Sequence, residues 1–230
     1  MGKFLWLIVY FCMVSVAWSG PFWVTDTAIP VGPGVYKLEE SFTDVTSLAT
    51  SIEYEAIPNM SLKLTLPYFT GSHSGFGDLE VKSKIRFVKG READPLSVAG
   101  QIVIKIPTAG DDPALKTSGE PDVGFVAIAS KPFNRVITHG NLGYIFIGGP
   151  GRDQLKYSLG FDVKTQWKML NFIGELYGQR TSGYGSIGGI LGGATYRLSP
   201  DLVLSGLLGL GLTHSSPDST AKVLVSYSLK

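Results

Sequence analysis

The feature that most constrains this chain is a repeated alternation of apolar and polar residues, in segments of about ten residues that continue to the end of the sequence. In the segment 202–213, for example, Leu204 and Leu208 alternate with Ser205 and Gly209. Successive side chains of a strand point to opposite faces, so one face of each segment is apolar and the other is polar. The pattern predicts an all-β fold, an antiparallel transmembrane β-barrel with its apolar face toward lipid.

Helical membrane spans are not expected. The mean hydropathy is only +0.18, and no stretch after the first 19 residues reaches the roughly eighteen uncharged apolar residues that a spanning helix needs. The 29 glycines and 13 prolines suit strands joined by turns. A soluble β-sandwich is the alternative, but ionisable residues along most of one face of 79–88 and of 155–164 favour a barrel with a wet interior.

The N-terminal leader indicates the compartment. Lys3 precedes an uncharged, mostly apolar run over 4–18, and small residues allow cleavage after Ser19. A membrane anchor is the alternative, but the run is short for a spanning helix. We therefore expect a signal peptide over 1–19, a periplasmic lead-in over 20–34 and an outer-membrane barrel over 35–230.

Composition excludes several classes of function. Cys12 is the only cysteine and lies in the leader, so no disulfide is expected after cleavage. The 20 Lys and Arg nearly balance the 19 Asp and Glu, which argues against a nucleic-acid partner. His73, His139 and His214 lack the spacing of metal ligands. We expect no metal and no cofactor.

The alternation predicts about twelve strands. Connections after even-numbered strands are mostly short and the others mostly longer, as expected when both termini are periplasmic. Two connections depart from this rule, because 44–46 is short for an external loop and 89–95 is long for a periplasmic turn. The predicted strands are 35–43, 47–56, 61–70, 79–88, 96–106, 122–131, 136–147, 155–164, 168–178, 184–198, 202–213 and 220–229.

The polar faces should point into the lumen, since a charge facing lipid at mid-membrane costs about 2–4 kcal/mol. The lumen-facing set is Glu39, Glu53, Glu55, Lys63, Lys82, Lys84, Arg86, Gln101, Lys105, Asn141, Lys156, Asp162, Lys164, Asn171, Glu175, Arg197 and Lys222. As pore-lining or selectivity residues we single out Lys82, Lys84, Arg86, Lys105, Glu53, Glu55, Asn141, Asn171, Glu175 and Arg197. Structural pairing across the interior is the alternative role for any of these charges.

One basic cluster predicts a solute preference. Lys82, Lys84 and Arg86 lie on one predicted strand and Lys105 on the next, and Glu80 alone cannot offset four cations. The cluster predicts a preference for anionic solutes such as aromatic acids.

An enzyme is not expected. His214, Ser215 and Asp218 lie in one predicted loop, where adjacent residues are poorly placed to act as base, nucleophile and orienting group. His139 starts a strand near the predicted periplasmic end, away from the lipid of the outer leaflet.

Several short motifs occur along the chain: Pro21-Phe22-Trp23-Val24-Thr25-Asp26, Val31-Gly32-Pro33-Gly34, Leu38-Glu39, Glu53-Tyr54-Glu55-Ala56-Ile57-Pro58-Asn59, Leu66-Pro67-Tyr68, Gly75-Phe76-Gly77-Asp78-Leu79, Leu198-Ser199-Pro200-Asp201-Leu202 and Ser216-Pro217-Asp218. Together they resemble the outer-membrane family labelled as meta-pathway phenol-degradation or transporter proteins. The resemblance implies a barrel that passes small hydrophobic or aromatic compounds. One departure is the end at Leu229-Lys230, where outer-membrane barrels usually have an aromatic residue that the assembly machinery reads.

The sequence therefore predicts a passive channel or uptake porter for small solutes in the bacterial outer membrane. Its expected partners are outer-membrane lipid, the barrel-assembly machinery and a small-molecule solute. A sealed barrel with a structural or adhesion role is the second hypothesis, and an outer-membrane lipid hydrolase is the third.

Overall fold

The computed structural model of this chain describes residues 25–28, 30–44, 47–71, 73–91, 95–110, 115, 118–148, 153–183 and 185–229. The predicted signal peptide, 1–19, lies outside the described residues. The described ranges hold no helix that is long and apolar enough to cross a bilayer. The strands are β1 (Tyr36–Thr43), β2 (Ser47–Ile57), β3 (Met60–Phe69), β4 (Gly75–Phe76), β5 (Leu79–Val88), β6 (Ser97–Ile106), β7 (Asp122–Phe133), β8 (Val136–Phe146), β9 (Gln154–Lys164), β10 (Leu170–Thr181), β11 (Ser186–Arg197), β12 (Leu202–Gly211) and β13 (Ser219–Leu229).

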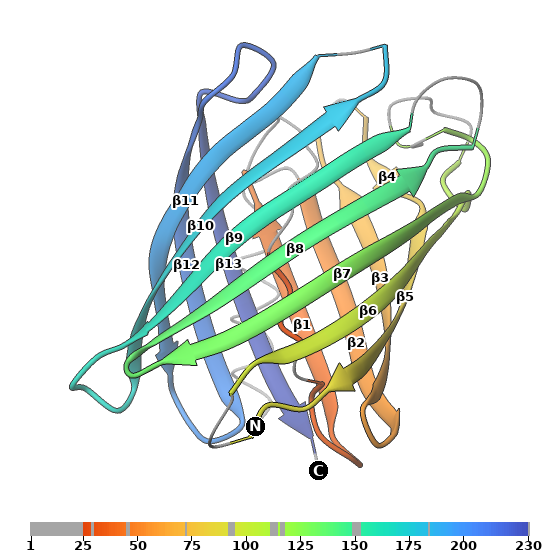
Figure 1. Ribbon diagram of the computed structural model, residues 1–230. Helices are drawn as coiled ribbons and strands as arrows, with labels where there is room; N and C mark the ends of the chain where they lie inside the picture. Colours follow the sequence, from red (N-terminus) through yellow and green to blue (C-terminus); the bar gives the residue numbers. More distant parts are fainter. Residues whose placement is uncertain are drawn as a thin grey trace, which may run out of the picture.

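Twelve of these strands form a closed antiparallel barrel (Figure 1). Neighbours in sequence pair with each other, β3 pairs with β5, and β1 closes the barrel by pairing with β13. The two-residue strand β4 pairs only with β3. β1 starts and β13 ends at the same end of the barrel, where Tyr36 pairs with Leu229 (Figure 1). The predicted all-β antiparallel barrel of about twelve strands is confirmed.

The two irregular connections do not change the strand count. The connection 44–46 joins β1 to β2 directly, and 89–96 joins β5 to β6. The register of β5 against β6 shifts between Arg86 and Val88, so a β-bulge accompanies the longer turn. Asn59 and Asn134 adopt φ values of 70° and 53° in two tight turns at this end, a conformation that asparagine tolerates better than most residues.

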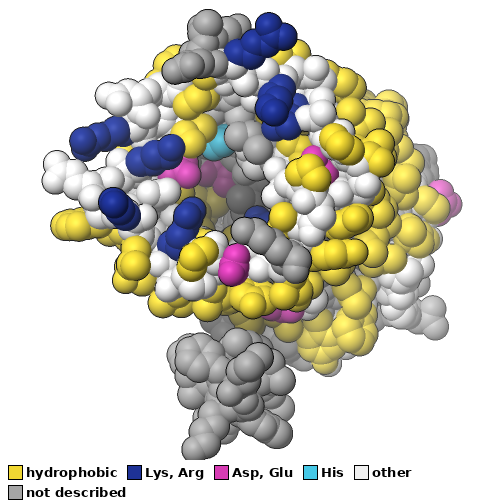
Figure 2. Space-filling model, turned by 90° about the horizontal axis from the view of Figure 1, so that it is seen from below, with side chains coloured by type: hydrophobic (Ala, Val, Ile, Leu, Met, Phe, Trp, Pro, Cys, Tyr) yellow, Lys and Arg dark blue, Asp and Glu magenta, His cyan; other side chains and the backbone are white. Residues whose placement is uncertain are grey.

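The outer surface of the barrel is apolar. Along β7, Phe125 is 53% exposed whereas its neighbour Val126 is 3% exposed, and the same alternation places Ile102, Leu142 and Leu159 on the outside. Figure 2 shows hydrophobic side chains around the outer surface of the barrel. A closed barrel with an apolar exterior is the architecture of a bacterial outer-membrane protein, in which lipid covers these side chains.

Candidate functional site

The barrel interior is polar and charged on the strands β1, β2, β3 and β5. The inward residues of this charged wall are Glu39, Glu53, Glu55, Lys63, Lys82 and Lys84. The register places Lys63 directly opposite both Glu53 and Lys82. Directly opposite residues of an antiparallel pair share one face, so the pairing brings these acids and bases together inside the barrel.

Ion pairs connect the charged wall. The Glu39 carboxylate contacts the ammonium groups of Lys37, at 2.6 Å, and of Lys63, and it also accepts a hydrogen bond from Ser226 on β13. Lys82 Nζ lies 2.7 Å from Glu80 Oε1. Two of these pairs lie within one strand, and the Lys63–Glu39 pair links β3 to β1. The hydrogen bond from Ser226 crosses the β1–β13 junction.

Lys84 is the most enclosed cation of this wall, with 4% of its side chain exposed. Its Nζ lies 3.5 Å from Glu53 Oε1 and 3.0 Å from Asp26 Oδ1. Glu53 also accepts a hydrogen bond from Ser61 Oγ at 2.7 Å. Lys84 therefore forms ion pairs with two carboxylates, Glu53 on β2 and Asp26 before β1.

The residues before β1, 25–28 and 30–34, form what we call the N-terminal segment, and part of it lies inside the barrel. Asp26 Oδ2 accepts a hydrogen bond from Gln101 Nε2 at 2.9 Å, and the Asp26 backbone oxygen accepts one from Asn141 Nδ2 at 3.2 Å. Although burial raises the pKa of Asp26, the positive charges of Lys84 and Lys82 outweigh it and lower this pKa to about 2. Asp26 is therefore a carboxylate at neutral pH.

Further hydrogen bonds fix the rest of the segment. The Thr25 hydroxyl donates to Glu175 Oε1 at 2.5 Å, and the Ala28 amide donates to Ser130 Oγ at 2.9 Å. The Gly32 amide donates to Glu55 Oε2 at 2.6 Å. These contacts reach from β2 through β7 to β10, so the N-terminal segment crosses the lumen.

Two groups of apolar residues also lie inside. Ala99, Val103, Val126 and Ile128, on β6 and β7, form what we call the apolar patch, and Ala28 of the N-terminal segment packs against it. The second group is on β10, β11 and β12, and we call it the glycine-lined cluster because Gly189 and Gly209 lie beside its large side chains. It consists of Tyr177, Leu191 and Leu207, with Ile173 and Ile187 packed against them.

The structure brings together part of the predicted site. Lys82, Lys84, Glu53 and Glu55 belong to the charged wall, and Lys105 lies opposite Glu80 in the register. Asn141 and Glu175 bind the N-terminal segment.

Arg86, Asn171 and Arg197 lie apart from this group. Arg86 donates two hydrogen bonds to Asn59 Oδ1 in the β2–β3 turn. Asn171 and Arg197 lie near the turns at the ends of β10 and β11. Whether any of the ten residues sets selectivity stays a prediction.

The prediction of an uncompensated basic cluster counted only the charges on β5 and β6. It did not include the acids that contact the cluster from other parts of the chain. Lys84 is compensated by Glu53 and by Asp26, neither of which lies on those strands. Asp26 belongs to a motif that carries the family resemblance, but no periodicity places it in the lumen. The contact between Ser130 Oγ and His139 Nδ1, at 2.9 Å, was also missed, and it orients the hydroxyl that holds Ala28.

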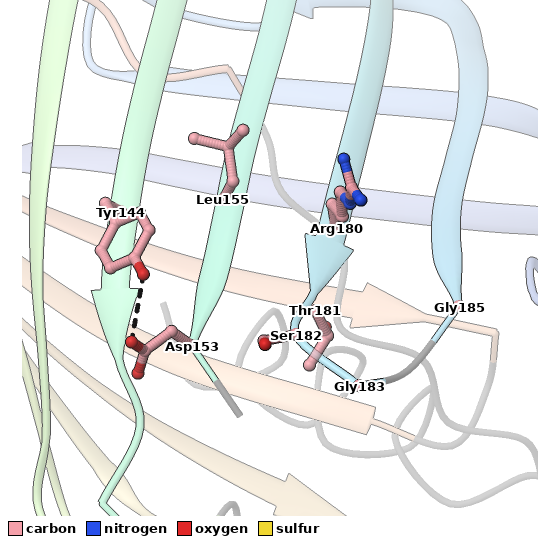
Figure 3. Close-up of a pocket in the computed structure, with 8 residues that line it drawn as sticks. All are labelled: Tyr144, Asp153, Leu155, Arg180, Thr181, Ser182, Gly183 and Gly185. Carbon is pink, nitrogen blue, oxygen red and sulfur yellow. Dashed lines mark hydrogen bonds between the residues drawn. The ribbon is translucent and has the colours of Figure 1, made fainter. Parts of the chain in front are cut away.

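A shallow cleft of about 470 Å³ lies at the other rim of the barrel, where β8 and β10 end and β9 and β11 begin. Figure 3 shows Tyr144 donating to Asp153, at 3.0 Å, while Arg180 points away from that pair. Tyr144, Leu155 and Arg180 share one row of the register, on the outer face of the barrel. The cleft is thus separate from the lumen.

Known structures share this architecture. A KdgM porin superimposes with a TM-score of 0.60 at 10% identity, over 85% of this chain and 99% of that one. The KdgM porin in complex with disordered oligogalacturonate gives 0.59 at 10% identity, over the same shares of the two chains. The NanC porin gives 0.59 at 9% identity, again over 85% and 99%. At these identities the likeness shows the fold.

No curated protein sequence is significantly similar to this chain. The family model described as "Putative MetA-pathway of phenol degradation" matches residues 19–229, which is nearly the whole sequence and confirms the resemblance found in the short motifs. The chain belongs to this family of phenol-degradation proteins.

Proposed function

We propose that the barrel is an outer-membrane channel for small solutes that combine an apolar body with a carboxylate, as simple aromatic acids do. The observation that carries the proposal is the division of the interior. Cations of the charged wall lie beside the apolar patch on β6 and β7. A cation binds a carboxylate by charge-assisted hydrogen bonds, and an apolar surface favours the body of the same solute.

The mouth of the barrel at which β1 starts and β13 ends supports entry or exit of anions. Figure 2 views this end and shows Lys and Arg side chains gathered around a hollowed centre. The turns and strand ends there carry Lys131, Arg135, Lys164, Lys168 and Arg197. A mouth with an excess of one sign of charge raises the local concentration of the opposite ion.

The comparisons support the same class of solute. The family description names phenol degradation, which concerns aromatic compounds. One porin of similar architecture is described in complex with oligogalacturonate. Sugar acids are therefore the natural competitor class to include in any test.

The test is flux into liposomes that hold the folded, heat-modifiable barrel. We expect benzoate to enter faster than benzylammonium, which has the same ring with the opposite charge, and faster than acetate, which lacks the ring. Galacturonate serves as the acid without an apolar body. Equal rates for benzoate and benzylammonium would contradict the proposal.

A sealed structural barrel is the second candidate, because the N-terminal segment crosses the lumen. It predicts no flux of any solute through the wild type, and flux only through a variant in which the segment is released.

A further inference from the structure

The contacts of Asp26 are those that a protein offers to a free carboxylate. One oxygen faces an ammonium group, Lys84 Nζ, at 3.0 Å, and the other accepts from an amide, Gln101 Nε2, at 2.9 Å. Such charge-assisted hydrogen bonds are among the stronger ones in proteins. Lys84 on β5 and Gln101 on β6 thus form an anion site, and Asp26 of the same chain occupies it.

An apolar surface adjoins this anion site. Ala99, Gln101 and Val103 alternate along β6, so all three point inward, and Ala99 and Val103 belong to the apolar patch. Ala28, two residues after Asp26, covers that patch and is fully buried. Asp26 and Ala28 therefore occupy a polar and an apolar subsite side by side.

From this juxtaposition we propose that Lys84, Gln101 and the apolar patch form a binding site for a small aromatic or aliphatic carboxylate. In the closed state Asp26 and Ala28 occupy this site in place of the solute. An incoming solute displaces them and thereby opens the lumen. This inference rests on the proposed channel function and adds the site and the way in which the solute opens it.

Displacement is feasible for three structural reasons. The Asp26 side chain is one-third exposed, so solvent reaches it. Lys84 keeps Glu53 as a partner when Asp26 leaves. Among the described residues, the N-terminal segment joins the barrel ladder only by an isolated bridge from Pro33 to Glu55, so displacement of Asp26 and Ala28 breaks side-chain contacts but no run of ladder hydrogen bonds.

The first experiment measures benzoate binding to the folded barrel in detergent by calorimetry. Asp26→Asn keeps the size of the side chain but removes the competing charge. If Asp26 fills the site nine-tenths of the time, its removal should strengthen the apparent affinity for benzoate about tenfold. Benzyl alcohol, which lacks the charge, should bind both forms more weakly than benzoate does. The matched control is Asp201→Asn, the same change in the turn between β11 and β12, which should bind benzoate as the wild type does.

Equal benzoate affinity in wild type, Asp26→Asn and Asp201→Asn would overturn the inference. A gain in Asp26→Asn that persists in Asp26→Asn/Lys84→Gln would also overturn it, because the carboxylate would then bind elsewhere. Both results leave the channel function intact. Failure of the channel function looks different: neither wild type nor Asp26→Asn would pass benzoate into liposomes, whatever they bind.

A cross-link tests displacement without removing any charge. A Cβ atom placed on Gly160 lies 3.0 Å from Thr25 Cβ, and the disulfide separation of about 3.8 Å therefore requires the two residues to move slightly apart. In a Cys12→Ser background, oxidised Thr25→Cys/Gly160→Cys should pass benzoate at least about tenfold more slowly than the same protein after reduction. Equal rates before and after reduction would show that the segment need not move.

Discussion

The charged wall and the glycine-lined cluster line the same barrel, yet different forces hold them together. In the charged wall, Lys84 is fixed by Asp26 and Glu53, and Glu39 by partners on β1, β3 and β13. In the glycine-lined cluster, large side chains pack into the space that neighbouring glycines leave. A Cβ on Gly189 would lie 2.6 Å from Tyr177 Oη, and one on Gly209 would overlap Leu191.

The difference teaches how one alternating pattern gives two interiors. Charge complementarity can act between side chains that are distant in sequence, as between Lys63 and Glu39 or Lys84 and Asp26, because long ionic side chains reach past a neighbouring strand. Size complementarity acts between adjacent strands, where a glycine leaves room for the large side chain beside it. The charged wall is therefore sensitive to loss of charge, and the cluster to loss of volume.

The largest effect is expected from Lys84→Met, which leaves the buried Glu53 and the partly exposed Asp26 without their shared cation. Removal of one partner from a buried ion pair costs about 3 kcal/mol of folding free energy. Urea unfolding in lipid vesicles, followed by tryptophan fluorescence, measures it. Lys168→Met, in an exposed turn, is the control and should shift stability by less than about 0.5 kcal/mol. Equal stability of the two variants would mean that charge does not hold this wall.

Leu207→Ala tests the volume rule in the glycine-lined cluster. Leu207 is 7% exposed and packs with Tyr177 and Leu191. Its truncation should cost about 2 kcal/mol, at the low end for buried leucines because the barrel interior can admit water. The same unfolding measurement applies. Leu212→Ala, at an exposed position beyond β12, should cost less, and a reversed order would contradict the assignment of inner and outer faces.

Charge selectivity should depend on the cations of β5, namely Lys82 and Lys84 of the charged wall together with Arg86 near the β2–β3 turn. In an Asp26→Asn background, replacing Lys82, Lys84 and Arg86 by Gln should lower the ratio of anion to cation permeability about tenfold, equivalent to about 1.4 kcal/mol. Reversal potentials in asymmetric salt measure the ratio. Lys168→Gln in the same background is the control. An unchanged reversal potential in the triple variant would limit these cations to a structural role.

The smallest effect is expected from Val126→Ser in the apolar patch, which removes apolar contact but no charge. The ratio of benzoate to acetate flux should fall about threefold, or about 0.7 kcal/mol. The ratio of anion to cation permeability should stay the same, so the two parts of the interior are separable. A parallel fall in both ratios would show that they act as one surface.

The sequence predicted most of the barrel because alternation is a local property. The strand 79–88 was predicted with its observed bounds, as β5. The predicted 168–178 ended early, since β10 runs to Thr181. Gly178 has no side chain to show the pattern, and Arg180 is polar although it points outward at the rim. Patterning by polarity fails at such positions, where the membrane ends.

The interior contacts could be predicted only in part. Alternation placed Glu53, Lys84 and Glu175 on inward faces, but it gives no partner for any of them. Thr25 and Asp26 lie in a segment without periodicity, and they bind residues on strands far along the chain. The strand register and the path of the N-terminal segment determine these contacts, and both are properties of the closed fold.

The seam between β1 and β13 has a consequence for the order of assembly. Eight residue pairs form it, from Tyr36 opposite Leu229 to Thr43 opposite Lys222. The barrel can therefore close only after β13, the last strand, has been inserted beside β1. Residues 25–28 precede the first strand and lie inside the finished cylinder. We expect them to be in place when the seam forms, so that a newly inserted barrel is already obstructed and does not leak during biogenesis.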